Sequence, residues 1–261
     1  MLINKETYQP LSFSSLKAFS ESPLAFINYK VGPRTESPAM LAGTMIHRAI
    51  LEPEVYDLTT CVWRDGRRGT TAHRDFVEDH LGQEVLTPKE DERYRTAAKM
   101  VRTHPLADEL LEHLTHAEEK VEFKHMGLKH RGIIDGRGQG YIMDLKTTND
   151  VSMRSFTNTV WSFKYYMQAA IYMHAARLHA YDVSNYYIIA MQSAAPFQVV
   201  VYKIDQNYID RGHLLWESLL EEYHAWDGKA QHPGYQDYDY SVMRTPTWAP
   251  SLDIDWSKKE V

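Results

Sequence analysis

The sequence of 261 residues has a single cysteine, Cys61, and no apolar run that approaches the length of a membrane span. One cysteine excludes an internal disulfide, a cysteine-ligated iron–sulfur cluster and a cysteine-rich zinc site. The first 30 residues lack the basic start and the apolar core of a signal peptide. We therefore expect a cytoplasmic protein with no membrane partner.

Basic residues are also scarce, because 29 lysines and arginines face 35 aspartates and glutamates, for a net charge of −6. This balance argues against general electrostatic adhesion to nucleic acid, although a local basic groove is compatible with it. Hydrophobic residues make up 43% and charged residues 25% of the chain, which is ordinary for a globular protein. The composition supports a sizeable core, and the length favours one large domain.

The order of the predicted elements indicates an α/β fold with a central mixed β-sheet flanked by helices. We expect one domain over residues 1–226 and an irregular tail at 227–261. In this domain, helices at 12–51 precede a core at 117–204 and a closing helix at 205–226. The strands are predicted at 118–124, 131–135, 141–146, 185–191 and 198–204, with a helix at 155–176.

The stretch 129–148 predicts a β-hairpin that places Asp135 at the end of one strand and Asp144 and Lys146 on the next. Because side chains alternate along a strand, Asp144 and Lys146 point the same way and Leu145 points into the core. Carboxylate oxygens are natural ligands of Mg²⁺, and a neighbouring lysine can hold a water or an anionic oxygen. The hairpin therefore carries the minimum equipment for metal-assisted cleavage of a phosphodiester. The turn is assigned to Gly136, Gly138 and Gly140.

Two predicted helices carry further polar residues at one-turn spacing. His47 lies four residues after Gly43 on the predicted helix 40–51, so the two share a face. Gln168 and Tyr172 are also four residues apart and share a helix face. These side chains are candidates to join the hairpin in one site.

Each of these residues taken alone has a simpler interpretation. Asp135 alone is typical of a turn before Gly136. Asp144 and Lys146 alone fit the exposed face of an edge strand, although buried charges in so apolar a strand need partners. The histidine alone is typical of a hydrogen-bonded core residue, and the glutamine and tyrosine are typical of helix surface and packing. Only their joint occurrence favours a site.

Taken in chain order, the segments GTMIH at 43–47, GIID at 132–135, DLKT at 144–147 and QAAIY at 168–172 form the set GxxxH, GxxD, DxK and QxxxY. This set resembles the RecB-type branch of the PD-(D/E)XK nuclease superfamily. The closer resemblance, suggested by the segment MDLKTT and the single-domain length, is to the RecE-like exonucleases (exonuclease VIII) of phages and prophages. It covers roughly residues 12–202 and implies a restriction-endonuclease-like core.

The resemblance implies a Mg²⁺-dependent enzyme that digests one strand of duplex DNA from a 5′ end. Such an enzyme leaves 3′ single-stranded tails for homologous recombination by strand annealing. Its implied partners are double-stranded DNA ends, further copies of itself in a trimeric or tetrameric ring, and a single-strand annealing protein. Because an imidazole ligand suits Mn²⁺ better than Mg²⁺, manganese is an expected second cofactor.

The resemblance also implies residue roles. Lys146 would orient or activate the attacking water and stabilise charge on the phosphate. The catalytic set would be His47, Asp135, Asp144 and Lys146, and the metal ligands would be His47, Asp135, Asp144 and the backbone carbonyl of Leu145. Gln168 and Tyr172 would contact the DNA backbone or buttress Lys146, and Ser14 and Ser15 would contact phosphates.

The basic segment 64–71 (RDGRRGTT) has two interpretations. Short charge runs are usually solvated loops. The alternative is a DNA-tracking or 5′-phosphate-binding element, in which Gly66 and Gly69 let the backbone approach a phosphate. The candidate contacts are Arg64, Arg67 and Arg68.

The sequence departs from the family pattern in two places. Ser22-Pro23 stands where some RecB-branch relatives carry a cluster-binding cysteine before the proline, so no iron–sulfur cluster is expected. Asp144 stands in place of the commoner glutamate. Two other functions remain alternatives: another DNA nuclease of the superfamily, either an endonuclease or a single-strand exonuclease, and a catalytically silent DNA-end-binding module.

Overall fold

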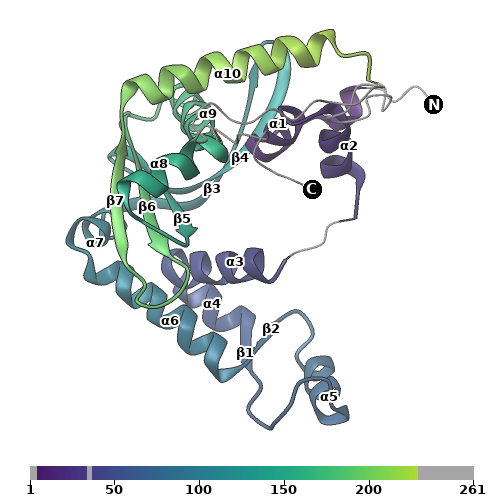
Figure 1. The fold of residues 1–261 in the computed structure, drawn as a ribbon, viewed down its shortest axis with the longest axis vertical. Helices are drawn as coiled ribbons and strands as arrows, with labels where there is room; N and C mark the ends of the chain where they lie inside the picture. The colour runs from purple at the N-terminus through teal and green to yellow at the C-terminus, as the bar shows by residue number, and fades with distance from the viewer. Residues whose placement is uncertain (1–4, 34–36, 229–261) are drawn as a thin grey trace, which may run out of the picture.

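The computed structural model describes residues 5–33 and 37–228, so nearly all of the tail predicted at 227–261 lies outside the described residues. Five strands form one mixed sheet with helices on both faces, as the sequence predicts (Figure 1). The helices are η1 (Lys5–Tyr8), α1 (Phe13–Phe19), α2 (Pro23–Val31), α3 (Pro38–Leu51), α4 (Pro53–Thr59), α5 (Thr71–Asp79), α6 (Pro88–Thr103), α7 (Pro105–Glu112), α8 (Met153–Ser162), α9 (Tyr165–Leu178) and α10 (Gln206–Ala225). The strands are β1 (Thr60–Val62), β2 (Glu84–Leu86), β3 (Leu114–His125), β4 (Leu128–Gly138), β5 (Gly140–Thr148), β6 (Val183–Gln192) and β7 (Val199–Ile204).

The main sheet has the strand order β3-β4-β5-β6-β7, in which β5 and β6 run parallel and the other neighbours run antiparallel. A two-residue turn joins β3 to β4, with left-handed φ values of 47° at Met126 and 76° at Gly127. Turns of this kind match the twist of the strands that they connect. The turn places His125 opposite Leu128, and the register that it sets holds as far as His116, which pairs with Arg137.

The β4–β5 hairpin has a tighter turn than the sequence analysis predicted. Gly136 and Gly138 lie within β4, and Gly138 pairs with Tyr141, so assigning all three glycines to the turn was wrong. A Cβ on Gly138 would lie 2.2 Å from Cζ of the Tyr141 ring. The glycine therefore serves close cross-strand packing in the strand.

The two faces of the sheet are covered by different helices. One core cluster joins α1, α2, α8, α9 and α10 to inward residues such as Ile134 and Ile142. The other joins α3, α4, α6 and α7 to residues that include Met143 and Leu145. Because neighbours along β5 alternate between these layers, Leu145 faces the α3 layer, and Asp144 faces the α9 layer.

The helix predicted over 155–176 is two helices, which was not expected. α8 ends before Phe163, and Lys164 takes a left-handed φ of 57° ahead of α9. Residues other than glycine seldom adopt this conformation. The break leaves the Phe163 side chain 47% exposed beside the start of α9.

A small lobe of β1, β2 and α5 projects from the main body on the side of α4 and α6 (Figure 1). Its two strands pair in parallel, and Trp63 packs against His73 and Phe76. The basic segment 64–71 belongs to this lobe. Among the described helices, none combines the length and the apolar character needed to cross a membrane.

Candidate active site

The site begins where β4 and β5 diverge. Their paired residues end at Gly136 and Met143, and the Asp135 carboxylate then replaces the backbone ladder. Asp135 Oδ2 accepts a hydrogen bond from the Leu145 backbone N–H at 2.8 Å. Burial raises the pKa of Asp135, while the charge of Lys146 and this hydrogen bond oppose the rise. A desolvated carboxylate is therefore held inside the fork between two strands.

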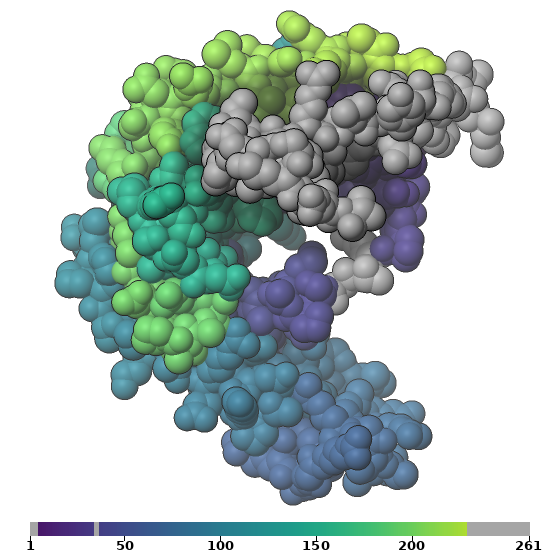
Figure 2. Space-filling model, in the orientation of Figure 1, coloured from purple at the N-terminus to yellow at the C-terminus, as the bar shows by residue number. Residues whose placement is uncertain are grey.

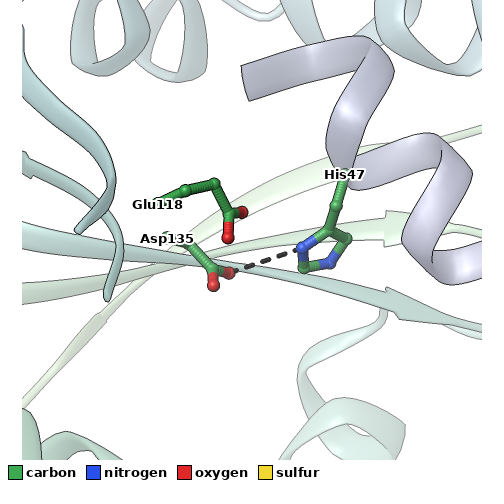
Figure 3. A group of neighbouring side chains, drawn as sticks. All are labelled: His47, Glu118 and Asp135. Atoms are coloured by element: carbon green, nitrogen blue, oxygen red, sulfur yellow. Dashed lines mark ion pairs between the residues drawn. The ribbon is translucent and has the colours of Figure 1, made fainter. Parts of the chain in front are cut away.

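Glu118 joins this carboxylate, and the sequence analysis missed it. The residue pairs on either side place Glu118 on β3 directly opposite Asp135. One ligand atom from each of His47, Glu118 and Asp135 lies within 4.8 Å of the other two (Figure 3). The turn at Met126-Gly127 sets this register, so counting back from the turn would have found Glu118.

The two opposed carboxylates repel each other. Burial, together with the charges of Asp135 and Glu52, raises the pKa of Glu118 to about 7, while the charge of Arg48 opposes the rise. Like charges directly across an antiparallel pair are destabilising. A bound cation would relieve this repulsion, so the pair favours a positively charged ligand.

His47 reaches the fork from α3. Its Nδ1 lies 3.6 Å from Asp135 Oδ2 (Figure 3). Burial, assisted by the charge of Lys146, lowers the pKa of His47 to about 4, so the ring is neutral at neutral pH. The neutral imidazole is the form that binds metals. The Leu145 backbone carbonyl, a sequence-predicted metal ligand, lies next to this ring.

Asp144 and Lys146 form an ion pair on the α9 side of β5. The Asp144 side chain is 1% exposed, and its Oδ1 accepts a hydrogen bond from Gln168 Nε2 at 3.0 Å. Burial raises the pKa of Asp144 to about 6, and the charge of Lys146 opposes the rise. Gln168 therefore holds the carboxylate that pairs with Lys146, which fits the predicted alternative that it buttresses the lysine. The other alternative, a contact with DNA, does not fit a side chain that is buried.

Tyr172 packs one turn farther along α9. A Cβ on Gly132 would lie 2.6 Å from Tyr172 Cε1, so the ring lies against bare backbone. Burial raises the pKa of the Tyr172 hydroxyl. Gly132 of the GxxD motif and Tyr172 of the QxxxY motif therefore pack directly against each other. This contact seats α9 on β4 beside the carboxylates.

The donors in the fork fit a divalent cation. An imidazole, two carboxylates and a backbone carbonyl are ligands acceptable to Mg²⁺ and Mn²⁺. His47, Glu118 and Asp135 supply the side chains, and Leu145 supplies the carbonyl. Both oxygens of Asp144 are engaged by Lys146 and Gln168, so its role as a direct ligand stays a prediction.

The family model described as a PDDEXK-like domain of unknown function (DUF3799) matches residues 12–240. The chain belongs to this family. Among solved structures, this PDDEXK-like chain is similar to the crystal structure of a "putative exonuclease" from Eubacterium rectale. The two share 13% identity with a TM-score of 0.58, over 94% of this chain and 96% of that chain. At this identity the likeness shows the fold alone. The family match and the mixed α/β sheet together confirm the predicted PD-(D/E)XK core.

A second solved structure, that of SSO0001, shares 13% identity with the PDDEXK-like chain. The superposition covers 74% of this chain and 89% of that chain. Its TM-score is 0.28, which is too low to inform the fold. A search of curated proteins finds no match to the sequence.

The structure decides some of the predicted DNA contacts of this PDDEXK-like domain. Ser15 is fully buried, and its hydroxyl bonds the backbone of Ser12, so its predicted phosphate contact was wrong. Arg68 pairs with Glu90 and donates to the Val85 carbonyl at 2.8 Å. These bonds hold the small lobe together, and the Arg68 side chain is still 44% exposed, so its phosphate contact stays a prediction. The exposed side chains of Ser14, Arg64 and Arg67 stay predicted contacts.

Two grooves of similar size open near the fork. The α3–α8 groove, of about 490 Å³, lies between α3, the end of β5 and the α8–α9 connection. Figure 2 shows this face of the molecule hollowed between α3 and α8. The α1–β4 groove, of about 480 Å³, lies over β3 and β4, with Ser14, Arg131 and Tyr172 in its wall. Each groove is lined by sequence neighbours of the site residues: Ile46 and Thr147 in the first, and Ile133 in the second.

Proposed function

We propose that this chain is a divalent-metal-dependent deoxyribonuclease, and that it acts as a 5′→3′ exonuclease on double-stranded DNA. One observation carries the nuclease proposal. A neutral imidazole and two opposed carboxylates meet in the fork between two strands, and a buried lysine–carboxylate pair lies directly behind them. A cation held by the first group can polarise a phosphate, and the lysine of the second can stabilise the negative charge that develops on it.

Membership of the PDDEXK-like family supports this proposal, because nucleases of the PD-(D/E)XK superfamily typically use divalent metals. The fold shared with the Eubacterium rectale protein supports it as well. The RecE-like subgroup, the 5′→3′ polarity and the 3′-tailed product rest on the motif resemblance. So do the oligomeric ring and the partnership with an annealing protein. Mg²⁺ is the proposed cofactor, with Mn²⁺ as a substitute.

In the proposed mechanism, His47, Glu118 and Asp135 hold the cation, with Asp144 and the Leu145 carbonyl beside them. A bound divalent cation would supply Lewis acidity at the phosphate and a water of lowered pKa. Asp144 keeps Lys146 charged, since their ion pair raises the pKa of Lys146. The ammonium can then stabilise negative charge that develops on the phosphate.

A cleavage assay tests the proposal. A linear duplex labelled at one 5′ or 3′ end is incubated beside a closed circular duplex with Mg²⁺, Mn²⁺, Ca²⁺ or EDTA. We expect mononucleotides released from the 5′ end of the linear substrate with Mg²⁺ or Mn²⁺, and an intact circle. Lys146→Ala and Asp144→Asn should abolish release. The exposed carboxylate variant Asp182→Asn should act as wild type.

Each other outcome identifies a different protein. Digestion of the circle makes the chain an endonuclease, and digestion only of single strands makes it a single-strand exonuclease. Retained DNA-end binding without cleavage under any metal makes it a catalytically silent module. Full activity in Lys146→Ala would remove the site assigned above from the reaction.

A further inference from the structure

Three lysines from separate elements gather at the start of α9: Lys17 of α1, Lys146 of β5 and Lys164. Lys17 Nζ lies 5.1 Å from the centre of the Phe163 ring. Lys146 Nζ lies 4.9 Å from the centre of the Tyr165 ring. The two rings stack on each other, with centroids 5.7 Å apart and planes 18° apart. A continuous row of cation, ring, ring and cation therefore runs from α1 to the proposed catalytic lysine.

Two cations and one carboxylate surround the outer end of this row. Burial lowers the pKa of Lys17, the charge of Glu21 opposes this, and the charges of Lys164 and Lys146 add to the lowering. A freely solvated lysine would turn away from two neighbouring cations. Lys17 is instead held in a partly buried position over the face of Phe163, a contact that favours a cation.

Lys164 adds charge from the other side. It is the N-cap of α9, so the positive end of the helix dipole lies at the same place. Its left-handed backbone breaks the helical run between α8 and α9, which brings Phe163 out to the surface. Local strain of this kind often accompanies a functional site.

The row also borders a groove. Phe163 and Tyr165 both line the α3–α8 groove, whose wall includes Ile46 and Thr147, the sequence neighbours of His47 and Lys146. An anion held by Lys17 and Lys164 would lie at the outer end of the row, next to Phe163. A polyanion bound at the fork could reach this position with its next charged group.

We propose that Lys17 and Lys164 bind a backbone phosphate of the DNA strand, next to the phosphodiester at the metal centre. Phe163 positions Lys17 for this contact. The proposal rests on the proposed nuclease function and names a second point at which the cleaved strand is gripped. Lysine ammonium groups suit a phosphate here because they act as point charges that need no fixed bidentate geometry.

DNA binding tests this subsite separately from cleavage. A fluorescent 5′-phosphorylated duplex with a short single-stranded end is titrated with protein in Ca²⁺ at several salt concentrations. The variants are Lys17→Ala, Lys164→Ala and Phe163→Ala, with Lys17→Arg as the conservative change. Lys99→Ala removes an exposed charge on α6 and serves as the matched control. Thermal unfolding confirms that each variant is folded.

We expect each lysine-to-alanine variant to bind roughly tenfold more weakly. Each should also lower the slope of log affinity against log salt by about 0.7–0.9. Lys17→Arg should keep the wild-type slope, Lys99→Ala should match wild type, and Phe163→Ala should weaken binding while keeping most of the slope. Wild-type affinity and slope in Lys17→Ala and Lys164→Ala would overturn the subsite, even if the wild-type protein cuts DNA. Loss of binding in both variants without cleavage by the wild type would leave the subsite standing and refute the nuclease proposal. Absence of DNA binding by the wild type would refute both.

Discussion

Replacing Glu118 by glutamine should weaken metal binding and yet stabilise the metal-free protein. The substitution keeps the shape of the side chain and removes one of two carboxylates that face each other across β3 and β4. In the metal-bound state a ligand is lost. In the metal-free state a repulsion is lost. A surface glutamate with a purely structural role would show neither effect.

The pKa of Glu118 sets the size of the stabilisation. Folding raises this pKa from 4.5 to about 7, so the folded protein disfavours the ionised form. The wild type therefore loses stability as the pH rises from about 4.5 through 7. At about 1.4 kcal/mol per pKa unit, and after discounting for solvent screening, the penalty at pH 8 is about 1–2 kcal/mol. The variant avoids it, which corresponds to roughly 4 °C in melting temperature.

Two measurements check this prediction. Calorimetric unfolding in EDTA at pH 8 and pH 4 should show the variant more stable at pH 8 and equal to wild type at pH 4. Titration with Mn²⁺ should show affinity reduced by roughly 100-fold.

Glu119→Gln is a matched control on the neighbouring residue. A hydrogen bond from Arg137 lowers the pKa of Glu119, so its contribution to stability is present above the unfolded pKa. Glu119→Gln should therefore destabilise the protein at pH 8 and leave Mn²⁺ binding unchanged. Wild-type Mn²⁺ affinity in Glu118→Gln, together with no gain of metal-free stability at pH 8, would refute the reasoning.

Three further predictions concern the surroundings of the site. Gly132→Ala should lower the free energy of unfolding by ~1–3 kcal/mol, because the added Cβ would lie 2.6 Å from Tyr172 Cε1. Urea titration measures this change, and an unchanged urea midpoint would contradict the prediction. Gln168→Leu removes the hydrogen-bond donor to Asp144 Oδ1. It should reduce the cleavage rate roughly tenfold and lower the free energy of unfolding by ~1–3 kcal/mol. A wild-type cleavage rate would exclude this positioning role. Burial lowers the pKa of His130 to about 4, so its contribution to stability is present above pH 6.5 and is lost as the pH falls through 4. In His130→Phe, the free energy of unfolding should therefore fall less steeply between pH 6.5 and pH 4. The same slope in the variant and the wild type would contradict this prediction.

The hairpin at 129–148 shows what local pattern can predict. Alternation along β5 correctly placed Leu145 in the core and put Asp144 and Lys146 on one face. The glycine pattern misplaced the turn, because strand pairing continues to Gly138 where the Tyr141 ring requires a residue without a side chain. Turn propensity cannot reveal such a cross-strand contact.

Glu118 and Gln168 show where pattern reasoning was incomplete. Glu118 is 17 residues from Asp135 in the chain and became visible only once the β3–β4 register was known. The motif favoured a role for Gln168 without indicating its partner. Packing of α9 on the sheet decides that partner, because it buries the amide against Asp144.

The sequence by itself indicated the superfamily, through the resemblance of its motif set, and most of the candidate residues. The periods of strand and helix then showed which of these residues share a face. It also determined the α/β class, because apolar alternation separates strands from helices. Only the tertiary structure decided which of these groups meet, which are buried, and which are already engaged. Those properties depend on contacts between distant segments: the fork that holds Asp135, the register that adds Glu118, and the ring stack that links Lys17 to Lys146.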